Sequence, residues 1–189
     1  SLKAVSLVHD GRADMYMKGL LDSKTFLKSV LNKEVGLRTG QPLSHVCVFE
    51  IPGIDRLLFF TDVAFMPYPT LEDKKFIIKY TVEVAKACGV ECPKVAPLAA
   101  VEVVNPKMPV TVEAAELTRM NEEGEIKDCI HAGNLVYKAI VHLVKVKNGC
   151  ILTGTKAPVI LTSRSDTFET KVNSIALAAV VAEEMKKNQ

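Results

Sequence analysis

The sequence predicts an α/β fold with a mostly parallel sheet, and two observations carry that prediction. Short apolar runs of strand length alternate along the chain with amphipathic segments of helix length, and Gly, Pro and Asp residues separate them. Strands that alternate with helices are typical of layered α/β proteins. A length of 189 residues allows one large hydrophobic core or two small ones.

Each predicted element rests on a local pattern. Helices are predicted where apolar residues recur every three or four positions, and strands where short apolar runs lie between turn residues. The predicted helices cover residues 2–9, 22–33, 70–89, 111–122, 135–146 and 166–185. The predicted strands cover residues 13–17, 46–51, 57–61, 95–104, 150–153 and 158–162.

Composition restricts the possible function classes. Hydrophobic residues make up 48% of the chain and charged residues 24%, as in ordinary globular proteins. No apolar run approaches the roughly 20 residues of a membrane span, and no secretory signal pattern opens the sequence, so we expect no membrane partner. A net charge of +2 does not favour binding to nucleic acid.

The cysteines indicate a compartment. Five cysteines at scattered positions favour reduced thiols in the cytoplasm over a framework of disulfides. The segment Cys88-Gly-Val-Glu-Cys92 has one spacer too many for a redox Cys-x-x-Cys pair. We therefore expect reduced cysteines, a cytoplasmic protein and no metal site.

The most informative segment is 157–166, Ala-Pro-Val-Ile-Leu-Thr-Ser-Arg-Ser-Asp. A short apolar strand ends here in Ser163 and Arg164, and Asp166-Thr-Phe-Glu169 has the spacing of a capping box that begins a helix. The backbone N–H groups and dipole at a helix start attract anions, and an arginine adds a fork suited to phosphate or carboxylate. This order predicts an anion site, although a surface arginine beside a helix cap would explain the same residues.

Several segments together resemble a known family. Residues 94–109 are a strand that runs into a proline-pinned loop, and Asn173-Ser-Ile-Ala-Leu-Ala lies in the last predicted helix. With the Ser163-Arg164 segment, they closely resemble the phosphate butyryltransferase branch of the phosphate acetyl/butyryltransferase family. Further matching segments keep the family's order over nearly the whole chain: 17–20, 37–40, 43–46, 61–62 and 132–134.

The resemblance implies a fold and an activity. The fold would be two α/β domains with an inter-domain cleft, like isocitrate and isopropylmalate dehydrogenases, with residues 1–65 and 163–189 in the first domain and 66–162 in the second. It also implies missing residues ahead of Ser1 and near 128–130. The implied reaction moves a short-chain acyl group, butanoyl or branched, between CoA and phosphate. CoA is then a substrate, no cofactor is needed, and a homo-oligomer is expected.

The resemblance also implies roles for individual residues. Arg164 would bind the transferring phosphoryl group, Ser163 would donate to a carbonyl or phosphate oxygen, and Asp166 is the candidate general base. The acetyltransferase branch carries its proposed catalytic aspartate several residues after Ser-Arg, where this chain has Thr170. The chain departs from the family there. The predicted substrate-binding residues are Lys18, Arg38, Asn105, Lys107, Gly133 and Asn134.

Position in the sequence supports some of these roles and offers alternatives. Lys18, Asn105 and Lys107 follow predicted strands, and ligands of open α/β sheets bind at the carboxyl ends of strands. Solvated charges would explain the lysines equally well, and helix capping would explain Asn134. His45 lies in an apolar strand, where a core histidine is the commoner explanation than an acid or base.

Three other functions remain open at this level. A metal-dependent decarboxylating dehydrogenase would need converging aspartates, which the sequence does not show. The second is an acyltransferase that uses acyl-carrier protein, although the Ser163-Arg164 segment favours CoA. A non-catalytic paralogue that binds CoA or acyl phosphate would explain the absent aspartate.

Overall fold

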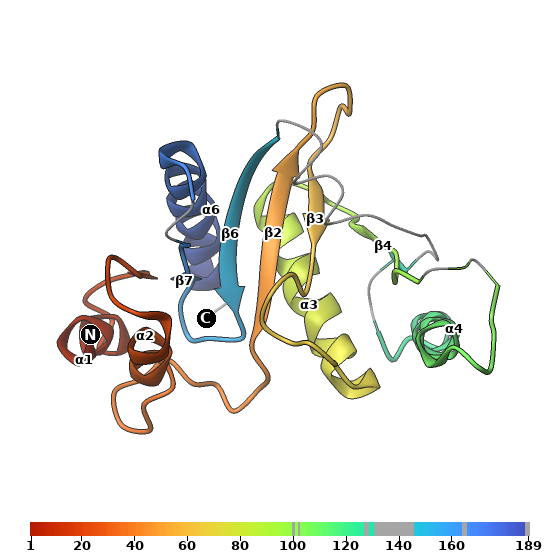
Figure 1. The fold of residues 1–189 in the computed structure, drawn as a ribbon, viewed down its shortest axis with the longest axis horizontal. Coiled ribbons are helices and arrows are strands. Elements are labelled where there is room, and N and C mark those ends of the chain that lie inside the picture. Colours follow the sequence, from red (N-terminus) through yellow and green to blue (C-terminus); the bar gives the residue numbers. More distant parts are fainter. Residues whose placement is uncertain (100, 102, 127–128, 131–145, 164–165, 188–189) are drawn as a thin grey trace. The chain divides into compact units, whose positions relative to one another are not determined.

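The computed structural model describes residues 1–99, 101, 103–126, 129–130, 146–163 and 166–187. The chain divides into two units, Ser1–Pro67 with Lys145–Gln189 (unit 1) and Tyr68–Val144 (unit 2). Figure 1 shows their helices and strands. Both units mix helices with strands, so the predicted α/β class is confirmed. The predicted helix over residues 135–146 lies outside the described residues.

Unit 1 contains a five-stranded sheet in the order β1-β7-β6-β2-β3. Its strands are β1 (Tyr16–Met17), β2 (Ser44–Glu50), β3 (Leu58–Phe60), β6 (Lys147–Thr153) and β7 (Val159–Ile160). Only β1 and β7 run parallel; the other neighbouring pairs are antiparallel. The prediction of a mostly parallel sheet is therefore wrong here. Short turns after β2 and β6 return the chain as hairpins, a connection that gives antiparallel strands.

β6 and β7 belong to unit 1, whereas their residues were predicted to lie in the second domain. β6 pairs with β2 over its full length, from Ser44 opposite Thr153 to Glu50 opposite Lys147. β7 pairs with β1. Alternation of elements along the sequence does not reveal which strands pair, and the expected boundary at residue 162 therefore differs from the division at Lys145.

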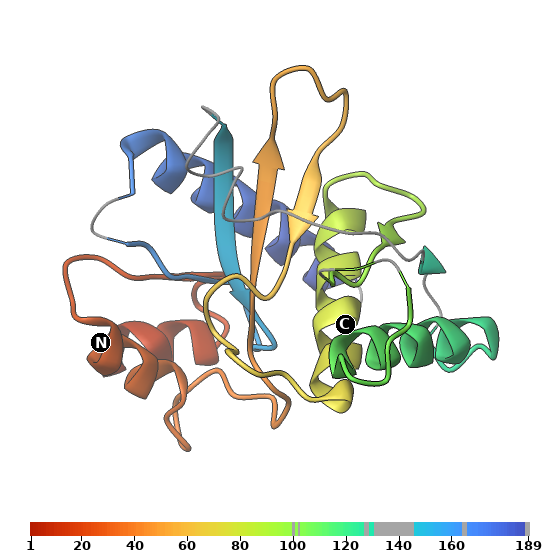
Figure 2. The same cartoon turned by 45° about the vertical axis from the view of Figure 1, so that its right-hand side comes forward.

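Helix α6 (Phe168–Lys187) covers one face of this sheet (Figures 1 and 2). Ser174 Oγ accepts the N–H of Cys150 at 3.0 Å and donates to the carbonyl of Thr170. Gly149 permits the close approach, because a Cβ there would lie 2.9 Å from the backbone carbonyl atoms of Asn173. Strand and helix thus meet backbone to backbone at this point.

The start of α6 differs from the predicted capping box at Asp166. Thr167 lies directly before the helix, and its Oγ1 accepts the N–H of Thr170 at 3.1 Å. Asp166 instead accepts the N–H of Ser163. The helix begins one residue later than the sequence pattern indicated, because a threonine caps as an aspartate does.

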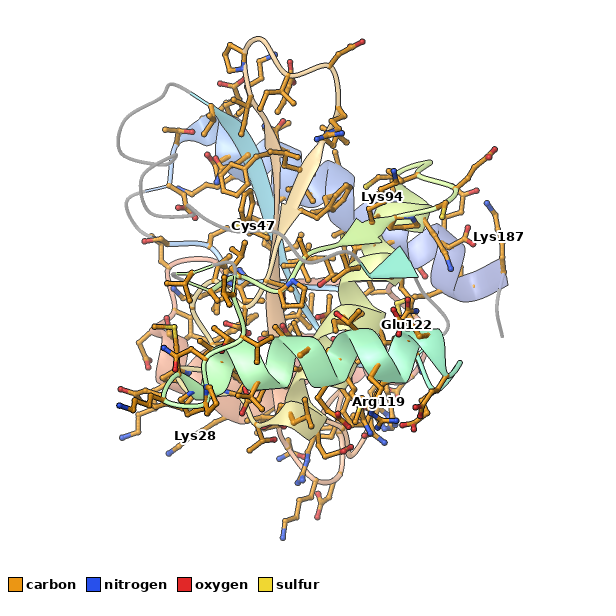
Figure 3. All side chains as sticks on the ribbon, turned by 90° about the vertical axis from the view of Figure 1, so that its right-hand side faces the viewer. Lys28, Cys47, Lys94, Arg119, Glu122 and Lys187 are labelled. Atoms are coloured by element: carbon orange, nitrogen blue, oxygen red, sulfur yellow. A yellow bond between two sulfur atoms is a disulfide. The ribbon has the colours of Figure 1, made fainter. Side chains whose placement is uncertain are left out.

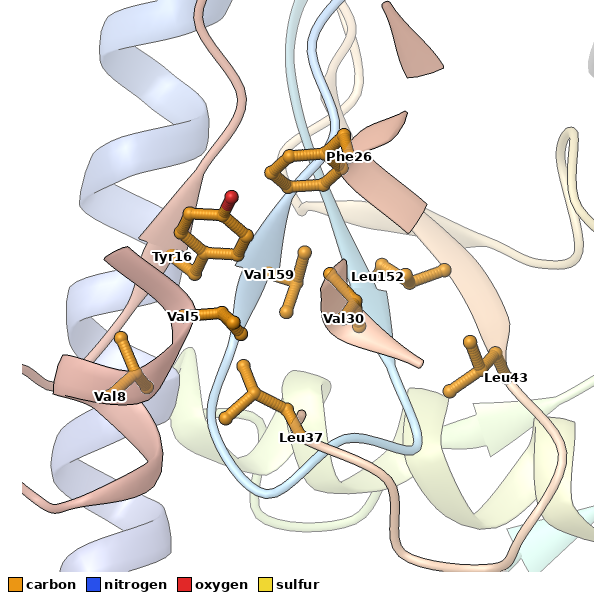
Figure 4. Packing of buried hydrophobic residues seen from close by; sticks show 9 residues of the cluster. All are labelled: Val5, Val8, Tyr16, Phe26, Val30, Leu37, Leu43, Leu152 and Val159. Atoms are coloured by element: carbon orange, nitrogen blue, oxygen red, sulfur yellow. The ribbon is translucent and has the colours of Figure 1, made fainter. Parts of the chain in front are cut away.

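The main core of unit 1 packs the helices α1 (Leu2–His9) and α2 (Ser23–Val30) against β1, β7 and β6. Tyr16 and Phe26 stack with their ring centroids 4.6 Å apart. Figure 4 shows the cluster, whose buried members are Val5, Val8, Tyr16, Phe26, Val30, Leu37, Leu43, Leu152 and Val159. This core fixes the edge of the sheet from which Lys18 and Ser163 emerge.

A disulfide joins Cys47 on β2 with Cys150 on β6, and Figure 3 shows Cys47 on its strand. The expectation of five reduced cysteines is therefore wrong for this pair. The two residues lie directly opposite each other in the β2–β6 register. Their separation of 103 residues hides that pairing from the sequence.

Unit 2 contains helices α3 (Leu71–Ala87) and α4 (Pro109–Glu122) and a parallel pair, β4 (Lys94–Val95) and β5 (Cys129–Ile130). The helices pack through Ile78, Val82, Leu117 and Met120, and Ile126, from the segment after α4, joins the same cluster. Thr70 and Asp73 form a capping box at the start of α3, in agreement with the helix predicted from residue 70. The strand predicted over 95–104 is limited, among described residues, to Lys94–Val95. Helix α4 begins at Pro109 rather than at Thr111, as suits proline in a first turn.

No helix in the described parts of the chain is both long and apolar enough to cross a membrane.

The contact between β6 and α6 gives a stability prediction. Gly149→Ala should lower the free energy of unfolding by about 1–3 kcal/mol, because the added methyl overpacks against the α6 backbone. Urea unfolding followed by circular dichroism measures the change. Gly19→Ala is the matched control, since a Cβ there would meet no described residue within 4 Å other than its chain neighbours. Equal stability of the two variants would contradict the prediction.

Candidate functional site

A pocket of about 480 Å³ opens in unit 1 at the carboxyl ends of the parallel strands β1 and β7. Its volume is in the range of small-molecule sites. Ligands of α/β proteins bind at such strand ends. Its lining residues are Lys18, Asp22, Ser23, His45, Ala64, Phe65, Leu161, Thr162 and Ser163. The structure therefore brings together two of the predicted site residues, Lys18 and Ser163.

Lys18 is buried at the end of β1, with 6% of its surface exposed. Its ammonium donates to the carbonyl of Thr162 at 3.1 Å, and Thr162 Oγ1 donates to the carbonyl of Lys18 at 3.1 Å. Thr162 is the single acceptor that the described residues give to three ammonium protons. A buried cation with donors to spare favours an anionic ligand, because burying a charge without a partner is costly.

Ser163 and Asp166 close a short loop between β7 and α6. Asp166 Oδ2 accepts the N–H of Ser163 at 2.6 Å, and the N–H of Asp166 donates to the carbonyl of Ser163. Ser163 is exposed and lines the pocket. Asp166 was predicted as a general base. In the structure its carboxylate instead holds the backbone of Ser163 in place. Arg164 lies outside the described residues.

His45 on β2 is a site residue that sequence reasoning set aside. Its side chain lines the pocket and is 9% exposed. Both ring nitrogens are buried and lack a hydrogen-bond partner among the described residues. Burial lowers the pKa of His45, and the carboxylates of Asp62 and Asp166 act in the opposite direction. The ring is therefore neutral near pH 7 and offers a lone pair.

An unpartnered buried polar group costs about 1–3 kcal/mol. The satisfied core histidine that the sequence analysis favoured is therefore not what the structure shows. The sequence did contain a sign of this site: a histidine directly before the apolar residues 46–49 of the strand.

The Asp62 carboxylate shapes the apolar wall of the pocket. Its Oδ2 accepts the N–H of His45 at 2.8 Å, and its Oδ1 accepts the backbone N–H groups of Ala64, Phe65 and Met66. Four bonds to one side chain hold the loop after β3 in place. They bring Ala64 and Phe65 to the pocket.

Three other predicted site residues, Arg38, Asn105 and Lys107, are not among the lining residues of this pocket. Arg38 is exposed, and its backbone forms an isolated antiparallel β-bridge with Thr155 in the connection between β6 and β7. Asn105 and Lys107 are exposed in unit 2, where Asn105 Oδ1 accepts the N–H of Lys107 at 3.0 Å. Asn105 also accepts from Thr111 and organises the start of α4. Gly133 and Asn134 lie outside the described residues.

Comparison with family models matches residues 1–131 and 128–179 to the model described as Phosphate acetyl/butaryl transferase. The chain belongs to this family. The two matches meet at 128–131, which is where the sequence analysis expects a missing segment. That segment stays a prediction.

Two relatives support the assignment to the family. A phosphate butyryltransferase of Clostridium acetobutylicum is 51% identical over 219 residues, which cover 96% of this chain and 73% of the relative. A probable phosphate butyryltransferase of Bacillus subtilis is 41% identical over 96% of this chain and 73% of its own length. Both names belong to the phosphate butyryltransferase branch, which the sequence motifs resemble.

A solved structure shares the fold. The branched-chain phosphotransacylase from Enterococcus faecalis V583 superposes with a TM-score of 0.81 and 32% identity. The match covers 96% of this chain and 78% of that protein. The family fold therefore extends over both units of the chain.

The pocket gives a binding prediction. Lys18→Met keeps most of the side-chain volume but removes the buried charge, so the dissociation constant for inorganic phosphate should rise at least about tenfold. A hydrogen bond to a charged group contributes about 1.5–3 kcal/mol. Isothermal titration calorimetry measures the affinity, and Lys3→Met, at an exposed position of α1, is the control. Equal affinities of the two variants would remove Lys18 from the site.

Proposed function

We propose that the protein catalyses reversible transfer of a short-chain acyl group between CoA and phosphate. The observation that carries this proposal is the buried ammonium of Lys18, held beside Ser163 in the pocket. Family membership and the 51% identity to a phosphate butyryltransferase supply the reaction.

The proposed chemistry forms one bond and breaks another. A phosphate oxygen attacks the thioester carbonyl carbon, and the carbon–sulfur bond then breaks to give acyl phosphate and the CoA thiolate. Lys18 and Arg164 would hold the phosphate oxygens, and Ser163 would donate to the carbonyl oxygen as negative charge develops on it. Holding both substrates in line supplies much of the rate.

Proton transfer needs one acceptor in the pocket. We assign it to His45 rather than Asp166, because Asp166 Oδ2 already accepts the N–H of Ser163 while both imidazole nitrogens lack a partner among the described residues. In the reverse direction the same nitrogen would take the proton of the CoA thiol, whose ordinary pKa is about 8.5.

The acyl chain would lie on the apolar side of the pocket. Ala64 and Phe65 come from the loop that Asp62 holds, and Leu161 follows β7. These side chains suit a butanoyl or branched short-chain group. CoA acts only as a substrate in this proposal, and acyl transfer to phosphate requires no redox cofactor.

Four broader expectations stay predictions. They are the inter-domain cleft on the pattern of isocitrate and isopropylmalate dehydrogenases, a homo-oligomer, a cytoplasmic location, and substrate contacts by Arg38, Asn105, Lys107, Gly133 and Asn134. No nucleic-acid or membrane partner is proposed.

One observation favours a second function, non-catalytic binding of CoA or acyl phosphate. Thr170 stands where the sequence analysis counted the family's proposed catalytic aspartate. Its Oγ1 donates to Asn148 Oδ1 at 3.1 Å, so the residue serves the contact between α6 and β6. A protein that only binds CoA or acyl phosphate needs no catalytic base, which agrees with a threonine at this position.

An assay of CoA release distinguishes the two functions. The protein should release CoA from butanoyl-CoA or a branched short-chain acyl-CoA only when phosphate is present, with unchanged turnover after chelation of metals. A thiol reagent follows the product. Binding of CoA without turnover would favour the non-catalytic paralogue, and phosphate-independent turnover would indicate a thioesterase.

Arg164→Lys tests the proposed phosphoryl contact. The change keeps the charge but replaces the planar guanidinium fork with one mobile ammonium. Loss of one preorganised donor costs about 3 kcal/mol, so turnover should fall about a hundredfold with little change in thermal stability. Arg12→Lys, on an exposed residue after α1, is the control. Full turnover of Arg164→Lys would reject the role.

A further inference from the structure

Three side chains that can bind a metal, His45, Cys47 and Cys150, gather on one face of the five-stranded sheet of unit 1. Their ligand atoms, an imidazole nitrogen and two sulfurs, all lie within 4.8 Å of one another. Neither the predicted reaction nor the pocket uses the two sulfurs. The cluster therefore needs its own explanation.

The strand register sets this cluster. His45 and Cys47 are two residues apart on β2, so both side chains project from the same face of the sheet. Cys150 on β6 lies directly opposite Cys47, and Leu152 lies opposite His45. The three ligands are thus placed by backbone pairing in the centre of the sheet, where the neighbour Leu152 offers the imidazole no hydrogen bond.

The imidazole of His45 has no other bond among the described residues. Nδ1 and Nε2 are both buried and without a hydrogen-bond partner. The carboxylate of Asp62 is near, but its two oxygens accept backbone N–H groups of His45 and of the loop that follows β3. A metal ion would satisfy a buried nitrogen for which the described parts of the chain provide no partner.

We propose that unit 1 holds a thiol-dependent Zn²⁺ site made by His45, Cys47 and Cys150. A dithiol reductant first supplies two electrons and two protons, which break the Cys47–Cys150 bond and give two thiols while the reductant becomes a disulfide. Zn²⁺ then binds both sulfurs and the imidazole, and the two thiol protons are released to solvent.

The ligand set suits zinc. Cysteine sulfur binds Zn²⁺ at about 2.3 Å and histidine nitrogen at about 2.0–2.1 Å in tetrahedral geometry. Thiolates and imidazole together select soft or borderline cations over Mg²⁺ or Ca²⁺. Three protein ligands leave the fourth position for water. Because the same sulfurs either bond to each other or bind the metal, the disulfide and the metal site exclude each other.

The site does not depend on the proposed acyl transfer, but it has a consequence for it. His45 also lines the pocket that contains Lys18 and Ser163. A metal on His45 would occupy the lone pair that we assign to proton transfer. Zn²⁺ should therefore inhibit the reduced protein and leave the disulfide form active.

Cobalt substitution tests the proposal without reference to activity. The protein is reduced, desalted without oxygen and titrated with Co²⁺, which reports thiolate ligands by charge-transfer absorption. We expect one Co²⁺ per chain, displaced by Zn²⁺, and no binding when the disulfide is intact. Binding of equal strength to reduced and oxidised protein, or no binding to reduced protein, would overturn the site, and neither result needs a variant.

Variants then identify the ligands. Cys150→Ser and Cys47→Ser should each weaken binding at least tenfold and reduce the charge-transfer band, and His45→Gln should weaken binding with that band kept. Cys92→Ser, on an exposed cysteine outside the disulfide, is the matched control and should bind normally. If Cys92→Ser alone abolishes binding, the ion lies elsewhere and the proposal fails.

Discussion

The paired hydrogen bonds between Lys18 and Thr162 join segments 144 residues apart, and the candidate site depends on them. They extend the parallel pairing of β1 with β7 beyond the last ladder residues and fix where each strand ends. Ser163 follows at once, so its position is set by the same contact. Burial of an ammonium is unfavourable without compensation, and one carbonyl compensates only in part. The remaining hydrogen-bonding capacity of the cation points to an anionic ligand.

The second constraint is the full-length antiparallel pairing of β2 and β6. It sets Cys47 opposite Cys150 and orients His45 toward the pocket. It also positions β6 for its close contact with α6 at Gly149, where no side chain intervenes. One wall of the pocket thus belongs to a rigid sheet. On the apolar side, Ala64 and Phe65 depend on a single carboxylate, Asp62, which accepts backbone N–H groups of their loop.

Sequence patterns predicted local structure better than pairing. The capping box at Thr70 was visible because all of its parts lie within four residues. The same pattern at Asp166 misplaced the helix start by one residue, since the adjacent Thr167 caps equally well. Cys47 on β2 and Cys150 on β6 are 103 residues apart, so the antiparallel pairing of these two strands and their disulfide could not be predicted from local patterns. Lys18 and Ser163 were correctly predicted to lie at one site, because each follows a strand of the parallel pair. Arg38 lies in the connection between α2 and β2 instead.

His45 unites the two chemistries that we infer for unit 1. Among the described residues its neutral imidazole has no hydrogen-bond partner. The imidazole has one lone pair, which can accept a proton or bind a metal but cannot do both. In the proposed reaction the proton would reach it from the pocket, while the sulfurs that would complete a metal site lie beside it on the sheet. The bond between Cys47 and Cys150 keeps those sulfurs from any cation. Formation of the disulfide would therefore protect the imidazole for acyl transfer, and its reduction would open the imidazole to competition by zinc.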